Sequence, residues 1–156
     1  MTGRIDTRLR ELGMVLPTLR TPRIARVEFY TLDDGFLFLS GQIPLWNGER
    51  RFIGKLGREF STPEGQEAAK LSMLNVLAAA KEALNGDLDR VKKVMKLVGF
   101  VNCTPEFDEI SQVVNGASDL VIEIFGDIGR HARTAIGAIS MPFGVAIEME
   151  AVFRVS

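Results

Sequence analysis

The sequence predicts an α+β fold in which two helices cover one face of a mixed sheet, in the order β-β-α-β-α-β-β. Three observations predict it: two segments with helical apolar spacing are separated by a strand, strand pairs stand at both ends, and the last segment alternates strictly. The chain has 156 residues and shows no repeat and no linker. This length suits one domain, so we expect a single domain over 1–156, with 1–23 as an N-terminal helical extension.

The N-terminal extension begins with a short helix. Ile5 and Leu9 stand at helical spacing, and Gly13 is suited to end the helix. Residues 1–26 hold six arginines against two acidic residues, which would suit a phosphate or RNA contact. No aromatic residue lies among these arginines to stack on bases, so a solvated amphipathic helix followed by a polar linker is the favoured interpretation.

Two short strands follow, over 24–31 and 36–43, and the Asp34-Gly35 pair between them is a strong hairpin-turn signal. The second strand ends in Ser40-Gly41. A glycine at the end of a strand permits close approach of a backbone or a ligand, although it can also be only a kink.

Ser61 and Glu64 fit a capping box and predict the start of the first long helix. It runs to about Leu84 and ends at Asn85-Gly86. The polar residues 45–60 before it are expected to be irregular, with a turn at 46–48.

The middle of the chain predicts a strand over 91–102 and then a second helix. The strand becomes apolar on both faces toward its end, so both faces should be covered, and another subunit could cover one of them. Thr104-Pro105-Glu106 predicts the start of the helix, and its one-sided apolar repeat ends near Gly126.

The last third predicts two strands, over 132–140 and 145–155, that form a hairpin about a turn at 141–144. A symmetric hairpin would place Glu148 opposite Gly137, about 13 Å along the strand from Arg133.

Composition excludes several classes of function. The net charge of −1 gives no general attraction for nucleic acid, and the single cysteine and single histidine exclude disulfide frameworks and multi-histidine metal sites. No apolar run is long enough for a membrane span or a signal peptide, so we expect a cytoplasmic protein. Cys103 has no evident activating base. His131 is expected to have a surface role, and a place at the mouth of a ligand cleft is the alternative.

Three segments resemble the Rid family, also called the YjgF family and known as endoribonuclease L-PSP. The resemblance covers residues 24–155 with insertions near 108–125, and the third segment is the most specific. The first segment is Ser-Gly-Gln-Ile-Pro at 40–44. The second consists of residues 98–101, Phe107 and residues 114–117. The third consists of residues 132–134, Met-Pro at 141–142 and residues 147–151.

The resemblance implies a homotrimer with a chorismate-mutase-like fold and ligand clefts between subunits. It implies hydrolysis of reactive 2-enamine or 2-imine intermediates to 2-keto acids and ammonia, without metal or organic cofactor. The partners expected are therefore other copies of the chain and a small carboxylate or imine metabolite, with no membrane and no nucleic acid.

The resemblance also assigns catalytic roles to two residues. Arg133 would hold the substrate carboxylate, which suits a planar guanidinium, and Glu148 would orient or deprotonate water. The alternatives are a structural salt bridge for Arg133 and a solvated, lysine-paired position for Glu148.

Four residues are expected to line the cleft by the same resemblance: Ser40, Gly41, Asn115 and Ala135. Asn115 is an unusual residue for an apolar helix, although an exposed position or a local backbone bond would also explain it.

The sequence departs from the family at two site positions and in length, since an extra N-terminal helix makes the chain longer. These departures resemble a divergent subgroup of the family. Ala135 stands where many members have cysteine, and Tyr30 is out of register with the first-strand tyrosine of deaminases. A non-catalytic trimer that binds small carboxylates is therefore the alternative function, and an endoribonuclease is the less favoured third.

Overall fold

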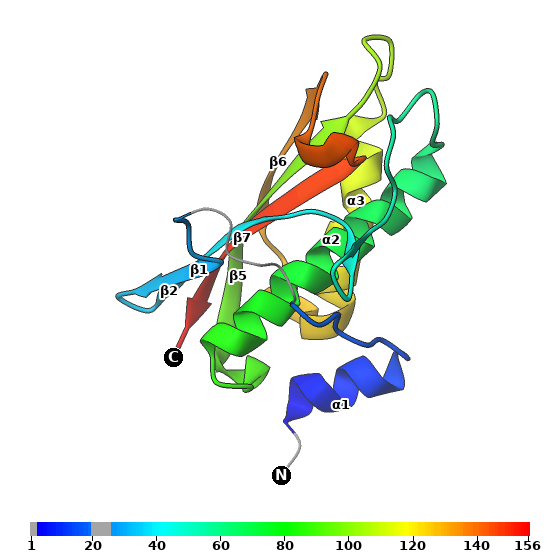
Figure 1. Cartoon of the computed structure of the whole chain (residues 1–156). Helices are drawn as coiled ribbons and strands as arrows, with labels where there is room; N and C mark the ends of the chain where they lie inside the picture. The colour runs from blue at the N-terminus through cyan, green and yellow to red at the C-terminus, as the bar shows by residue number, and fades with distance from the viewer. Residues whose placement is uncertain (1–2, 20–25) are drawn as a thin grey trace.

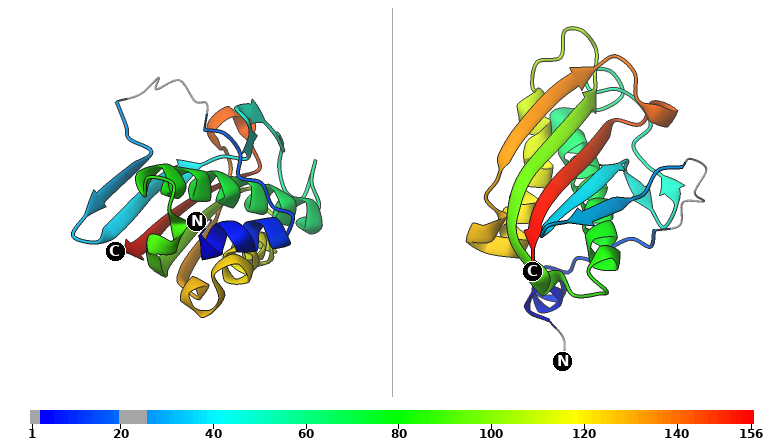
Figure 2. Two further views of the ribbon diagram at one scale, coloured as in Figure 1. Left: turned by 90° about the horizontal axis from the view of Figure 1, so that it is seen from below. Right: turned by 90° about the vertical axis from the view of Figure 1, so that its left-hand side faces the viewer.

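The structure is a computed structural model that describes residues 3–19 and 26–156. Two long helices cover one face of a five-stranded mixed sheet with strand order β1-β2-β7-β5-β6 (Figure 1). The opposite face of the sheet carries no helix of the described chain, as the right-hand view of Figure 2 shows. The predicted α+β class, with helices on one face, is confirmed.

The elements have the following bounds. The helices are α1 (Arg4–Glu11), α2 (Thr62–Ala83) and α3 (Ile110–Phe125). The sheet contains β1 (Tyr30–Asp33), β2 (Phe36–Gln42), β5 (Val91–Asn102), β6 (Ala132–Ala138) and β7 (Ile147–Val155). A separate ribbon pairs β3 (Leu45–Trp46) with β4 (Glu49–Arg50), and 3-10 turns are η1 (Leu88–Arg90), η2 (Gly126–Gly129) and η3 (Pro142–Gly144).

Helix α1 is docked on the rest of the chain. Ile5 and Leu9 are buried. The Asp89 carboxylate accepts the backbone N–H groups of Arg4 and Ile5 at 2.6 and 2.8 Å, which satisfies donors that the first helical turn leaves open. Asp6 also pairs with Lys81 at 2.7 Å, so the predicted helix is confirmed and lies in polar and apolar contact with its neighbours.

The first strand pair is shorter than predicted. Residues 24 and 25 lie outside the described residues, and β1 begins only at Tyr30. The turn is confirmed, because Asp34 and Gly35 both have positive φ, at 44° and 77°. In the region expected to be irregular, Asn47-Gly48 makes a second turn and produces the ribbon β3–β4.

Helix α2 forms as predicted. The Glu64 carboxylate accepts the Ser61 backbone N–H at 2.8 Å and the Ser61 hydroxyl at 2.7 Å, and these bonds lower the pKa of Glu64. The helix ends at Ala83, before the predicted Asn85-Gly86 stop. No helix within the described residues combines the length and the apolar character needed to cross a membrane.

Helix α3 begins six residues later than predicted. The Thr104 N–H donates to Leu56 O at 3.1 Å, which keeps the chain extended beyond β5, and the Phe107 N–H closes a turn on Thr104 O. The helix therefore starts at Ile110. It crosses α2 at Gly116, where an added Cβ would lie only 2.8 Å from the backbone carbon of Gln66.

The predicted hairpin of the last two strands is wrong. Strand β6 pairs in parallel with β5, with Leu97 opposite Arg133, and β7 pairs antiparallel on the other side of β5, with Phe100 opposite Glu148. The connection is a crossover and not a tight turn. Its η3 segment is held to another loop, because Gly54 N–H donates to Gly144 O at 2.8 Å.

Candidate active site: two half-sites on one chain

The first group of site residues surrounds Glu148 on the open face of the sheet. Its neighbours Ile147 and Met149 are buried toward the helices, so the alternation of β7 points Glu148 the other way. Strand β2 has an irregular register between Leu39 and Gln42, and this brings Gly41 against the carboxylate. An added Cβ on Gly41 would lie 2.8 Å from Glu148 Cδ. We call Ser40, Gly41 and Glu148 the acidic half-site.

Glu148 is a half-buried carboxylate without a partner in the described residues. Burial raises its pKa, and the neighbouring Glu150 carboxylate raises it further. A carboxylate in this state is a better proton acceptor than an exposed one. Ser40, the chain neighbour of Gly41, donates its hydroxyl hydrogen to Glu28 O at 2.6 Å, and it lines a shallow pocket together with Glu150.

The second group surrounds Arg133 at the start of edge strand β6. Its Nη1 donates to Asn115 Oδ1 at 2.7 Å and to Ser118 Oγ at 3.1 Å, and its Nη2 donates to Ser111 O at 3.4 Å. All three acceptors belong to α3. We call Asn115, Ser118, Arg133 and Ala135 the arginine half-site.

Arg133 makes no salt bridge with any carboxylate of the described residues. Within those residues, the alternative role of Arg133 in a structural salt bridge is therefore removed. Neutral oxygens fix the guanidinium, while its Nε–H and one Nη2–H have no acceptor among the described residues. A guanidinium can offer Nε and Nη2 donors to the two oxygens of a carboxylate.

Asn115 and Ala135 play different parts. Asn115 stands three residues before Ser118, so both face β6 from one side of α3, and the bond to Arg133 accounts for an amide in an apolar helix. Ala135 is paired with Gly99, and its methyl group packs against the core. It offers no side-chain donor or acceptor.

The two half-sites do not meet within one chain. Arg133 reaches toward the helices, whereas Glu148 points to the open face. They are separated by the width of β5 and by three residues of register, or about 10 Å across and about 10 Å along the sheet. The structure thus gathers the predicted site residues into two sets and separates the sets.

Tyr30 takes no part in either set. It is paired with Leu39, which is buried against the helices, and its ring packs against the same core. It lies on the face of the sheet opposite Glu148. Cys103 is a buried free thiol at the end of β5.

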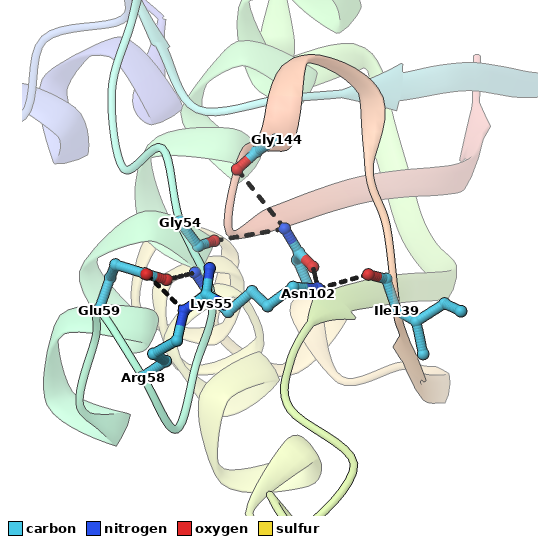
Figure 3. Close-up of polar contacts among 7 residues, drawn as sticks. All are labelled: Gly54, Lys55, Arg58, Glu59, Asn102, Ile139 and Gly144. Atoms are coloured by element: carbon cyan, nitrogen blue, oxygen red, sulfur yellow. Dashed lines mark hydrogen bonds and ion pairs between the residues drawn. The ribbon is translucent and has the colours of Figure 1, made fainter.

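Two groups of functional interest were missed from the sequence. Ser118 and His131 are hydrogen-bonded at 2.9 Å beside Arg133, and no pattern in the sequence indicates that these residues, 13 positions apart, are in contact. The other is a polar clamp at the far end of β5, where Asn102 Oδ1 accepts from Lys55 Nζ at 2.6 Å (Figure 3). Lys55 also donates to Ile139 O, and Asn102 Nδ2 donates to Val145 O at 3.0 Å.

This clamp holds the strand ends next to the acidic half-site. Asn102 is buried and lies two residues beyond Phe100, the partner of Glu148. The only sequence signal for this clamp is an asparagine at the end of an apolar strand. The loop that carries its partner Lys55 has no recognisable motif.

Residues 6–151 match the model of the YjgF/chorismate mutase-like family, whose description continues "putative endoribonuclease". The chain belongs to the YjgF family. The match spans both half-sites, confirms the resemblance drawn from the sequence, and identifies the fold as the YjgF/chorismate-mutase-like one.

Similar proteins extend over nearly the whole chain. TCP17 of Trypanosoma cruzi is 42% identical over 156 residues, covering 99% of this chain and 96% of TCP17. The crystal structure of Atu1372 from Agrobacterium tumefaciens, a protein of unknown function, is 41% identical with a TM-score of 0.90, covering 97% of this chain and 93% of that one. A "putative endoribonuclease" from Shewanella oneidensis is 32% identical with a TM-score of 0.92, covering 97% and 99%. YjgF relatives thus include counterparts of most of the N-terminal extension.

Proposed function

We propose that this protein hydrolyses reactive 2-imine and 2-enamine acids to 2-keto acids and ammonia, in clefts between the subunits of a homotrimer and without a cofactor. The observation that carries the proposal is the state of Arg133. Neutral acceptors on α3 fix its guanidinium, and its Nε–H and one Nη2–H have no acceptor among the described residues, which leaves both donors for a carboxylate ligand.

A neighbouring subunit would complete each site. The half-sites of one chain are too far apart to share a small ligand, so the acidic half-site of one copy would face the arginine half-site of the next. Exposed apolar side chains support such contact: Ile136 and Ile139 at the edge strand are 47% and 80% exposed, and Phe38 on the open face is 49% exposed. Cyclic assembly repeats one interface and forms an identical cleft at each repeat.

The proposed reaction needs one base and one carboxylate grip. Glu148 takes a proton from water as the water oxygen bonds to the imine carbon, and the C=N electron pair moves to nitrogen. The nitrogen gains that proton, which gives a carbinolamine. Glu148 then moves the proton of the new hydroxyl to the nitrogen, the C–N bond breaks, and ammonia leaves as the carbonyl forms. Glu148 is ionised again at the end, and Arg133 holds the substrate carboxylate throughout.

The test is hydrolysis of imines generated in situ by an amino-acid oxidase, in competition with semicarbazide. We expect the wild type to lower semicarbazone formation and release keto acid and ammonia, and Arg133→Ala to abolish the effect. Equal rates for the wild type and Arg133→Ala would refute the assignment of the carboxylate grip.

A second candidate is a trimer that binds small carboxylates without turning them over. It is favoured by the position of Tyr30 on the covered face and by the methyl group of Ala135, since neither supplies the chemistry expected of deaminases in the family. Glu148→Gln separates the two functions. In a hydrolase it removes turnover and retains ligand binding, whereas in a binding protein there is no turnover to lose.

RNA cleavage is less favoured for this chain. The net charge is −1, and the single histidine has both ring nitrogens engaged in hydrogen bonds. RNA cleavage that survives Arg133→Ala and Glu148→Gln would point to another site or to a contaminating nuclease.

A further inference from the structure

His131 and Ser118 form a hydrogen-bonded chain behind Arg133. His131 Nδ1 lies 2.6 Å from Gly129 O, His131 Nε2 lies 2.9 Å from Ser118 Oγ, and Ser118 Oγ lies 3.1 Å from Arg133 Nη1. The chain therefore runs from a backbone carbonyl to the guanidinium through two side chains.

The direction of each bond follows from the chemistry of its partners. A carbonyl oxygen only accepts, so His131 Nδ1 carries the proton. In the neutral ring Nε2 is then an acceptor, and the Ser118 hydroxyl donates a hydrogen bond to it. The lone pairs of Ser118 are left for an Nη1–H of Arg133, so each of the three donors in this hydrogen-bonded chain has an acceptor.

The anchor of this chain is rigid. Gly129 packs so closely on α3 that an added Cβ would lie 2.6 Å from Val121 O. Ser118 is only 8% exposed, on the face of α3 turned toward β6. Ring and hydroxyl are thus held by backbone that cannot shift easily.

The neutral state of the ring agrees with its surroundings. Partial burial lowers the pKa of His131, the bond to Gly129 O raises it, and the positive charges of Arg133 and Lys93 lower it again. Lys93 donates to Asp127 O at 3.3 Å, so it is held near the ring by η2.

We propose that Ser118 and His131 are positioning residues that fix the Arg133 guanidinium in the orientation that binds a carboxylate. This inference rests on the proposed role of Arg133. Neither residue touches the ligand; Ser118 holds Nη1, and His131 holds the Ser118 hydroxyl in the orientation that accepts from it.

Binding of pyruvate, measured by calorimetry on the full chain, tests the inference. Loss of one hydrogen bond to a charged group predicts about tenfold weaker binding for Ser118→Ala and His131→Leu, and a smaller loss for Ser118→Thr, which retains the hydroxyl. Ser72→Ala is the matched control, because Ser72 is a buried helical serine whose hydroxyl has no partner among the described residues. It should bind pyruvate as the wild type does.

NMR of the His131 imidazole reports its tautomer and its pKa, which a merely structural role of Ser118 would not change. The chain has one histidine, so in untagged protein the imidazole nitrogen signals belong to His131. We expect the neutral Nδ1–H tautomer at pH 7, and a higher ring pKa in Ser118→Ala because the donor to Nε2 is lost. The Nε2–H tautomer in the wild type would overturn the inference.

The outcomes separate this inference from the proposed function. If Arg133→Ala abolishes pyruvate binding while Ser118→Ala and His131→Leu bind normally, the positioning role is refuted and the carboxylate grip stands. If Arg133→Ala binds as the wild type does, the carboxylate grip itself fails, and the positioning role fails with it.

Discussion

Replacement of Gly41 by alanine should remove activity while leaving the fold intact. The new Cβ would lie 2.8 Å from Glu148 Cδ and 3.1 Å from its Cγ. Carbon atoms pack at about 3.5–4.0 Å, so the carboxylate must retreat by about 1 Å. A misplacement of that size can cost about 100-fold in rate, and we expect at least this loss in imine hydrolysis.

The cost to stability should be small. Gly41 is not among the residues with positive φ, so alanine adopts its backbone without strain, and the obstacle is the end of a flexible side chain. We expect a change within about 1 kcal/mol in the free energy of unfolding, or a few degrees in Tm. Gly116→Ala is the contrasting control. There the obstacle is the backbone of Gln66, and we expect the free energy of unfolding to fall by about 3 kcal/mol.

Imine hydrolysis and thermal unfolding of Gly41→Ala, Glu148→Gln and the double variant measure this prediction. Because Gly41→Ala acts through Glu148, the double variant should be no slower than Glu148→Gln alone. Full activity in Gly41→Ala, or a further loss in the double variant, would refute the inferred contact between these two residues.

Three further predictions concern stability. Burial raises the pKa of Glu148 in the folded chain, so its contribution favours folding at low pH and is lost as pH rises through the folded pKa. Glu148→Gln should therefore raise Tm near neutral pH by a few degrees at most, with the gain vanishing in acid; an unchanged gain at low pH would contradict this. Asn102→Ala should cost about 2–4 kcal/mol in urea unfolding because Lys55 and Val145 O lose their partner; a cost under about 0.5 kcal/mol would show that the clamp is dispensable. Asp89→Ala should speed amide exchange in α1 by uncapping Arg4 and Ile5, whereas unchanged exchange would mean that apolar docking alone holds the helix.

Local signals in the sequence predicted the elements whose ends depend on their own residues. Ser61 and Glu64 determine the start of α2 by bonding to each other, and Asp34-Gly35 forms its turn through its own φ angles. Strand β5 ends where its apolar run ends. Such features need no knowledge of the rest of the fold.

Features that depend on distant partners could not be predicted in this way. Thr104 looks like the start of a helix, but Leu56 O takes its N–H and delays α3. The segments at 132–140 and 145–155 look like a hairpin because nothing in them reveals that β5 will stand between. The family resemblance named the site residues, yet only the strand order showed that they fall on two faces.

The contact between Ser118 and His131 also depends on distant parts of the chain and could not be predicted from the sequence. Neither residue belongs to a recognisable motif, and their contact requires α3 to present Ser118 toward the edge of β6. His131 was expected at the surface, but Gly129 and Ser118 hold it half-buried.

Mixing two inactive variants tests the division into half-sites most directly. Arg133→Ala and Glu148→Gln, each inactive alone, would be co-expressed and the mixed oligomers assayed for imine hydrolysis. If each site takes Arg133 from one subunit and Glu148 from the next, random mixing in a cyclic trimer should restore activity at about a quarter of the sites. No restoration in verified mixed oligomers would contradict sites shared between subunits.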